Sequence, residues 1–158
     1  MNKSIRKATL NDVPLILEYV KQLAVYEKMF DQVVASEELL TEWLFRKNVA
    51  EVIFALDGQK EVGFALYFHN FSTYLGRAGI HLEDLFVLPE YRGKGFGKLL
   101  LKEIAKTAVE RGCGRVEWAC LDWNKPSIEF YERLKASRLN EWLIFRLTGA
   151  ELENLAKE

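Results

Sequence analysis

The stretch that decides the fold is residues 82–97, which read LEDLFVLPEYRGKGFG. An apolar run that ends at Val87 predicts a strand, and Pro89 closes it. Three glycines at alternate positions follow, and an apolar stripe at helical spacing begins at Phe96. Glycine lets backbone N–H groups approach an anion, and a helix N-terminus adds partial positive charge. This order of elements therefore predicts a phosphate-binding turn.

Two common nucleotide motifs do not fit this turn. Walker A reads GxxxxGK[ST], whereas Gly93 and Gly97 lie one residue too close together and Lys98 is followed by Leu99. The dinucleotide pattern GxGxxG differs from the GxGxG spacing found here. A tight strand-to-helix turn without a ligand is the structural alternative.

The rest of the chain alternates short strands with amphipathic helices. We expect strands at residues 4–7, 52–56, 62–68, 80–87, 115–119 and 142–147, with a loop at 70–79. We expect helices at residues 13–27, 36–44, 96–112 and 126–134 and from Thr148 onward, with Val109 in the apolar stripe of the third. Asp57-Gly58 predicts a hairpin turn. The pattern indicates a single α/β domain over residues 1–158, with a mixed, mostly antiparallel sheet and helices on both faces.

Composition narrows the class of protein. The chain has 158 residues, 49% of them hydrophobic, which is enough for one core. A net charge of -1 favours neither nucleic acid nor a membrane surface, and no apolar run reaches the roughly 18 residues of a span. We expect a cytoplasmic protein. Cys113 and Cys120 flank a predicted strand, so they should be too far apart to form a disulfide. We expect both to be buried thiols. The cysteines and histidines do not have the spacing of metal ligands.

Read as Arg92, Gly95 and Gly97, the turn has the pattern RxxGxG and resembles the diphosphate loop of the GCN5-related N-acetyltransferase (GNAT) family. Residues 124–131, NKPSIEFY, resemble a second segment of that family, and the resemblance covers almost the whole chain. Residues 24–27 and 82–84 make it closest to diamine N-acetyltransferases of the spermidine/spermine type and their thialysine-acetylating relatives. The resemblance implies a GNAT-like sheet with a bulged strand at residues 82–87, a splayed central strand pair that holds acetyl-CoA, and a homodimer.

The resemblance also implies which residues bind the cofactor. The backbone of one strand would pair with the pantetheine chain and polarise the acetyl carbonyl, the turn would bind the diphosphate, and the segment from Asn124 would contact the cofactor. The implied residues are Leu85, Phe86, Val87, Arg92, Gly93, Lys94, Gly95, Phe96, Gly97, Lys98, Asn124, Pro126 and Ser127. Arg92, Lys94 and Lys98 are expected as mobile cations around the turn.

Acetyl transfer to an amine needs a base and an acid. An alkyl amine with a pKa of about 10.4 is almost wholly ammonium at neutral pH, so a group must accept its proton. By resemblance Glu83 is the base, acting through water, and the phenol of Tyr131 protonates the departing thiolate. A surface carboxylate and a core aromatic are the structural alternatives.

Recognition of a diamine requires anionic groups that hold the distal ammonium, with aromatic rings beside them. The candidates are Tyr26, Glu27, Glu83, Asp84, Glu117, Trp118 and Asp122, each of which has a surface or packing role as its alternative. We therefore expect transfer of acetyl from acetyl-CoA to a primary amine of a small molecule, a polyamine or a lysine-like amino acid, by direct attack in a ternary complex. The alternatives are a peptide acetyltransferase, an acyl-CoA sensor without activity, and a nucleotide-phosphate-binding module.

One residue departs from the family pattern. Lys135 stands where family members commonly have glycine. We expect a left-handed conformation there, at a cost of about 1 kcal/mol.

Overall fold

The computed structural model describes residues 2–158, which form two compact units that divide between Ala119 and Cys120. The first unit holds the sheet and three helices, and the C-terminal unit holds two helices.

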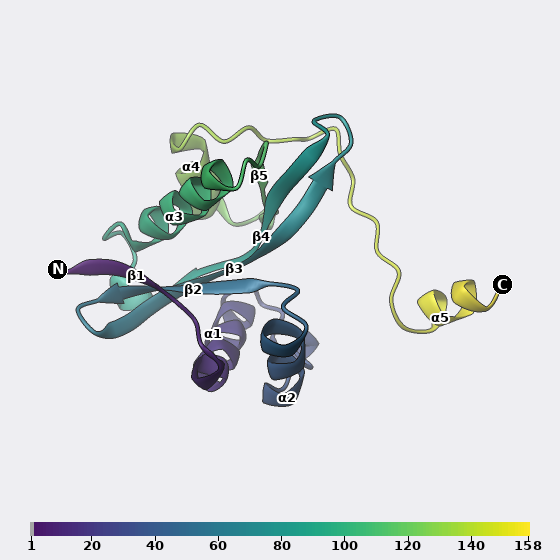
Figure 1. The fold of residues 1–158 in the computed structure, drawn as a ribbon, viewed down its shortest axis with the longest axis horizontal. Helices are drawn as coiled ribbons and strands as arrows, with labels where there is room; N and C mark the ends of the chain where they lie inside the picture. Colours follow the sequence, from purple (N-terminus) through teal and green to yellow (C-terminus); the bar gives the residue numbers. More distant parts are fainter. Residues whose placement is uncertain (1) are drawn as a thin grey trace. The chain divides into compact units, whose positions relative to one another are not determined.

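A five-stranded sheet, in the order β1-β2-β3-β4-β5, forms the centre of the first unit (Figure 1). The strands are β1 (Lys3–Lys7), β2 (Glu51–Asp57), β3 (Lys60–Ser72), β4 (Arg77–Val87) and β5 (Val116–Glu117). The first four are antiparallel neighbours and β5 is parallel to β4. The predicted mixed, mostly antiparallel sheet is confirmed.

Helices cover both faces of this sheet (Figure 1). They are α1 (Val13–Tyr26) and α2 (Glu37–Leu40) on one face, with a π-helical turn (Thr41–Arg46) after α2, and α3 (Phe96–Glu110) on the other. Single 3-10 turns lie at Leu10–Asp12, Phe30–Gln32 and Pro89–Tyr91. On the α1 face, the ring of Tyr19 lies 5.6 to 6.3 Å from the rings of Phe54, Phe64 and Phe86.

Local signals in the sequence place several of these boundaries correctly. The carboxylate of Asp12 accepts a hydrogen bond of 2.6 Å from the backbone N–H of Thr9, ahead of α1. The hydroxyl of Ser36 accepts one of 3.1 Å from the N–H of Leu39 and caps α2. Gly58 has φ +61 in the turn between β2 and β3.

Four predictions for the first unit and its border need correction. The expected loop at 70–79 is shorter, because polar residues at the ends of β3 and β4 still pair, out to Ser72 with Arg77. The strand expected at 115–119 is reduced to Val116–Glu117. Val109 is 79% exposed, since it lies about 100° round α3 from the buried Ala108. The two cysteines are not buried as expected, since Cys113 is half-buried and Cys120 is exposed.

The C-terminal unit contains α4 (Lys125–Arg133) and α5 (Gly149–Lys157). The strand predicted at 142–147 is wrong: the segment has no strand assignment, and Phe145 is 90% exposed. A strand needs a neighbour for its backbone hydrogen bonds, and apolar composition alone does not supply one.

The end of α4 confirms the expectation for Lys135, which has φ +67. The N–H of Lys135 donates to the carbonyl of Glu132 at 2.9 Å, and the N–H of Ala136 donates to the carbonyl of Tyr131 at 3.2 Å. This pair of bonds is a Schellman motif, in which the left-handed position usually holds glycine.

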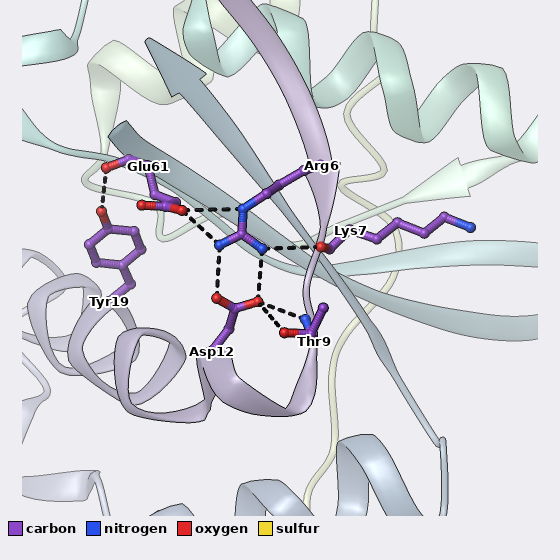
Figure 2. A network of polar contacts seen from close by, with 6 residues as sticks. All are labelled: Arg6, Lys7, Thr9, Asp12, Tyr19 and Glu61. Atoms are coloured by element: carbon purple, nitrogen blue, oxygen red, sulfur yellow. Dashed lines mark hydrogen bonds and ion pairs between the residues drawn. The ribbon is translucent and has the colours of Figure 1, made fainter. Parts of the chain in front are cut away.

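A cluster of ion pairs ties β1 to the start of α1 and to β3 (Figure 2). The Arg6 guanidinium donates two hydrogen bonds of 2.8 Å to the carboxylate of Asp12 and one of 2.7 Å to that of Glu61. It also lies 4.8 Å from the ring centroid of Phe54, and Tyr19 donates to the carbonyl of Glu61 at 2.8 Å. The cluster therefore joins β1 and the start of α1 to β3, which is distant from both in the sequence.

Replacing Asp12 by asparagine tests the stability that this cluster supplies. Hydrogen bonds from Arg6 lower the pKa of the Asp12 carboxyl to about 2. Since an unfolded aspartate has a pKa of about 3.9, the stabilisation is present above pH 4 and is lost as the pH falls toward 2. We expect Asp12→Asn to lower the free energy of unfolding by about 2 kcal/mol at pH 7 and by about half as much at pH 3, measured by urea titration. Asp31→Asn, at an exposed position, is the control, and an equal loss at both pH values would contradict the prediction.

Candidate functional site

The glycine turn leads directly into the N-terminus of α3. Gly93 has φ +73 and Gly95, the residue before the helix, has φ +91, a region that side chains with a Cβ rarely adopt. The first intrahelical bond runs from the N–H of Leu99 to the carbonyl of Gly95 at 3.0 Å. The N–H groups of residues 96–98 precede it and have no acceptor within the helix. These amides and the helix dipole suit a diphosphate, so the turn fits the group that the sequence predicts.

The cations near the turn are not all arranged as expected. The Nε of Arg92 donates to the carbonyl of Val87 at 2.8 Å, and its guanidinium lies 4.9 Å from the ring of Tyr26 and 5.5 Å from that of Phe86. Arg92 therefore links the end of β4 to the end of α1 and is not a mobile cation. Lys98 is exposed on the first turn of α3.

A lysine that the sequence analysis missed lies against the turn. The Nζ of Lys3 donates a hydrogen bond to the backbone carbonyl of Lys94 and lies 5.1 Å from the ring centroid of Phe96. The side chain of Lys94 lies 5.3 Å from the ring of Tyr91. No local pattern marks Lys3, because its partners are far away in the sequence and meet it only through the sheet.

Strand β4 carries the predicted bulge. Asp84 pairs with Leu66 and Leu82 pairs with Tyr67, so Glu83 is the extra residue on β4. The pairing of β4 with β5 ends at His81, whereas β4 continues to Val87. The last stretch of β4 therefore has no partner in β5, which is the splay that the resemblance implies. Within it, Leu85 and Val87 are half-buried and Phe86 is buried.

Three carboxylates gather where α1 ends and β4 bulges. Burial, followed by the negative charges of Glu83 and Glu27, raises the pKa of the Asp84 carboxyl to about 7. Burial, followed by the charge of Glu83, also raises the pKa of Glu27. Neighbouring carboxylates repel one another when they are all ionised, so a cation bound between them would be stabilised. The structure brings together three of the residues that the sequence nominated for amine binding.

Within the acidic group, the side chain of Glu83 is 55% exposed, and its Oε2 lies 3.5 Å from the Nε2 of His81. The other nominated residues of this unit lie in different surroundings. Glu117 forms an ion pair of 3.1 Å with the Nε of Arg115, so its charge is already partnered. Trp118 is half-buried.

The C-terminal unit holds the second segment of the resemblance. Asn124 is buried and caps α4, because its Oδ1 accepts a hydrogen bond of 3.4 Å from the N–H of Ser127. Pro126 stands in the first turn, where proline is favoured. Tyr131 lies about two helical turns beyond Asn124, on the same side of α4. It is half-buried, and its ring lies 5.5 Å from that of Phe130. Asp122 is exposed ahead of the helix.

One hollow of the first unit lies elsewhere. It has a volume of about 700 Å³ between α3 and strands β1 to β3, and its lining includes Ile5, Tyr67, Glu103 and Arg111 but none of the predicted site residues. Among residues 2–158, no three His, Cys, Asp or Glu side chains are arranged so that they could hold a metal ion. Over the same residues, no helix has the length and apolarity needed to cross a bilayer.

Comparison with known proteins identifies the family. Residues 18–135 match the model of the acetyltransferase (GNAT) family. A thialysine N-epsilon-acetyltransferase of Sus scrofa is 41% identical over 96% of each chain, and an L-ornithine N5-acetyltransferase of Arabidopsis thaliana is 35% identical over 99% of this chain and 89% of its own. A solved integron cassette protein from the mobile metagenome of V. cholerae superposes with a TM-score of 0.81 at 29% identity, covering 100% of this chain and 99% of its own. These matches confirm the fold and the resemblance together: the chain belongs to the GNAT family and is an N-acetyltransferase.

Proposed function

We propose that the protein transfers the acetyl group of acetyl-CoA to the primary amine at the end of a small molecule, by direct attack in a ternary complex. The observation that carries the proposal is the acidic group formed by Glu27 at the end of α1 and by Glu83 and Asp84 on β4, the strand that leads into the diphosphate-binding turn. A cation site and an anion site on one strand suit an ammonium substrate and an anionic cofactor.

In this proposal the first unit binds the cofactor in two places. The amides of residues 93–98 hold the diphosphate, with Lys94 and Lys98 as cations at the rim. The backbone of Leu85, Phe86 and Val87, beyond the last pair with β5, binds the pantetheine chain as an added strand. A backbone N–H there donates to the acetyl carbonyl, which acetyl-CoA supplies as a thioester that a neutral amine can attack. Asn124, Pro126 and Ser127 of the C-terminal unit contribute further cofactor contacts.

The acidic group handles the proton of the amine. Glu83 on the bulge accepts it through water, and Asp84 is a second acceptor because its pKa lies near neutrality. Glu27, with Tyr26 beside it, binds the distal charged end of the substrate. Glu117, Trp118 and Asp122 are weaker substrate candidates, since Arg115 already pairs with Glu117 and Asp122 is exposed.

Tyr131 completes the proton balance. The ammonium loses its first proton to the carboxylate, which passes it to solvent. The phenol of Tyr131 gives a proton to the sulfur as the carbon–sulfur bond breaks, and the second proton that the nitrogen loses as the amide forms returns the phenol to its neutral state. The position of Tyr131 on the helix that Asn124 caps supports this role, because the cap fixes where the helix begins.

The names of the relatives narrow the choice of the amine that accepts the acetyl group. Thialysine and ornithine both carry a primary amine at the end of an amino acid side chain, and both relatives align with nearly the whole chain. We therefore favour a lysine-like amino acid over a polyamine. We also propose a homodimer and a cytoplasmic location, and we propose that neither nucleic acid, membrane nor metal takes part.

A panel of amines tests the proposed acceptor. Release of CoA thiol from acetyl-CoA is measured with thialysine, ornithine, lysine, spermidine and an N-terminal peptide. We expect the highest kcat/KM for an amino acid with a terminal side-chain amine, and a loss of about 10²- to 10⁴-fold in kcat for Tyr131→Phe. Phe130→Leu, a change on the same helix, is the control for packing. Turnover of the peptide alone would contradict the assignment, and CoA binding without turnover of any amine would identify a sensor.

A pH profile tests the role of Asp84. Its carboxyl is neutral below a pKa of about 7 and ionised above it, so attraction for an ammonium grows as the pH rises through 7. We expect kcat/KM for the amine to rise through this range in the wild type, and the inflection to vanish in Asp84→Asn. Glu27→Gln should move the inflection to lower pH, because a neighbouring negative charge is removed. Glu90→Gln is the control, and an unchanged inflection in Asp84→Asn would exclude this role.

A further inference from the structure

We propose that Lys3 orients the peptide between Lys94 and Gly95 so that the turn presents its amide to the cofactor's diphosphate. This inference rests on the proposed cofactor site. It assigns a positioning role in cofactor binding to a residue on β1, outside the family motifs at residues 24–27, 82–97 and 124–131.

Two contacts and one close approach place the Lys3 ammonium beside the turn. It donates to the carbonyl of Lys94, lies 5.1 Å from the ring of Phe96, and would lie 3.0 Å from a Cβ added to Gly95. Phe96 is 1% exposed, so the ammonium rests on a fixed surface. An ammonium over an aromatic face is attracted by the ring, which supports this position.

The strand end that carries Lys3 is itself held in place. Lys3 is opposite Asp57 in the register of β1 and β2, and the N–H of Gly58 donates to the carbonyl of Asn2 at 2.8 Å. The same β2–β3 hairpin brings Lys60, whose Nζ lies 5.1 Å from the ring of Tyr91. Lys3 is therefore an anchor on the sheet and not a free surface lysine.

Because the peptide bond is planar, the hydrogen bond from Lys3 also fixes the direction of the neighbouring N–H in the turn. The carbonyl of Lys94 and the N–H of Gly95 belong to one peptide plane and point in opposite directions. A lysine that holds the carbonyl on one side directs the Gly95 N–H to the other. Gly93 and Gly95, on either side of Lys94, both have positive φ. Rotation of the Lys94–Gly95 peptide changes ψ of Lys94 and φ of Gly95, and glycine tolerates such a change in φ. Lys3 therefore fixes one orientation of the Lys94–Gly95 peptide, which could otherwise rotate.

Binding measurements with Lys3→Met, Lys3→Arg and Lys7→Met test the role. We expect Lys3→Met to weaken CoA binding about 3- to 10-fold and to raise the KM for acetyl-CoA by the same factor, with kcat nearly unchanged. Arginine retains a charged donor and should restore most of the affinity, and Lys7→Met removes the same charge from the other end of β1 without effect. Dephospho-CoA keeps the diphosphate, so Lys3→Met should weaken its binding by the same factor as that of CoA. If Lys3→Met lost affinity for CoA but not for dephospho-CoA, Lys3 would contact the 3′-phosphate and the proposal would be overturned. Wild-type affinity of Lys3→Met for CoA would also overturn it.

An NMR measurement on the free protein separates this proposal from the proposed function. In Lys3→Met we expect the Gly95 amide resonance to shift or broaden, while that of Gly112, at the far end of α3, stays in place. An unchanged Gly95 resonance would overturn the role of Lys3 even if CoA binds. Absence of CoA binding to the wild type would instead reject the cofactor site, and the Gly95 resonance would still decide whether Lys3 orients the peptide.

Discussion

Backbone pairing along β3 holds β4 in antiparallel register from Arg77, opposite Ser72, to Val87, opposite Gly63. The fit is close, because a Cβ on Gly63 would lie 2.6 Å from the carbonyl oxygen of Phe86. One irregularity interrupts this pairing, and it places Glu83 on a bulge. The acidic group, the end of β4 that has no partner in β5, and the entry into the glycine turn all depend on the pairing of β3 with β4.

Local chemistry made part of this arrangement predictable. The backbone of Gly93 and Gly95 needs a conformation that glycine adopts readily, so their pattern marks the turn and the start of α3. Asp57-Gly58 likewise marks the turn between β2 and β3, where Gly58 has φ +61. Both signals act over a few residues and are readable in the sequence. The left-handed conformation of Lys135 was predictable only through the family pattern, in which glycine is usual at that position.

Features that depend on distant partners were not predictable in the same way. Arg92 was expected to face an anion, but the carbonyl of Val87 and the ring of Tyr26 hold it elsewhere. Lys3 gave no signal, since its partners are reached only through the sheet. Residues 142–147 have the composition of a strand but no strand assignment, because a strand is a property of two segments and not of one.

Chemical-shift mapping of the backbone amides during a titration with CoA tests the central claim most directly, because it reports where the cofactor binds without requiring turnover. The account predicts the largest shifts in the turn at residues 93–98 and in the end of β4 at residues 85–87. Largest shifts around the hollow between β1 and α3, at Ile5, Glu103 and Arg111, would contradict it.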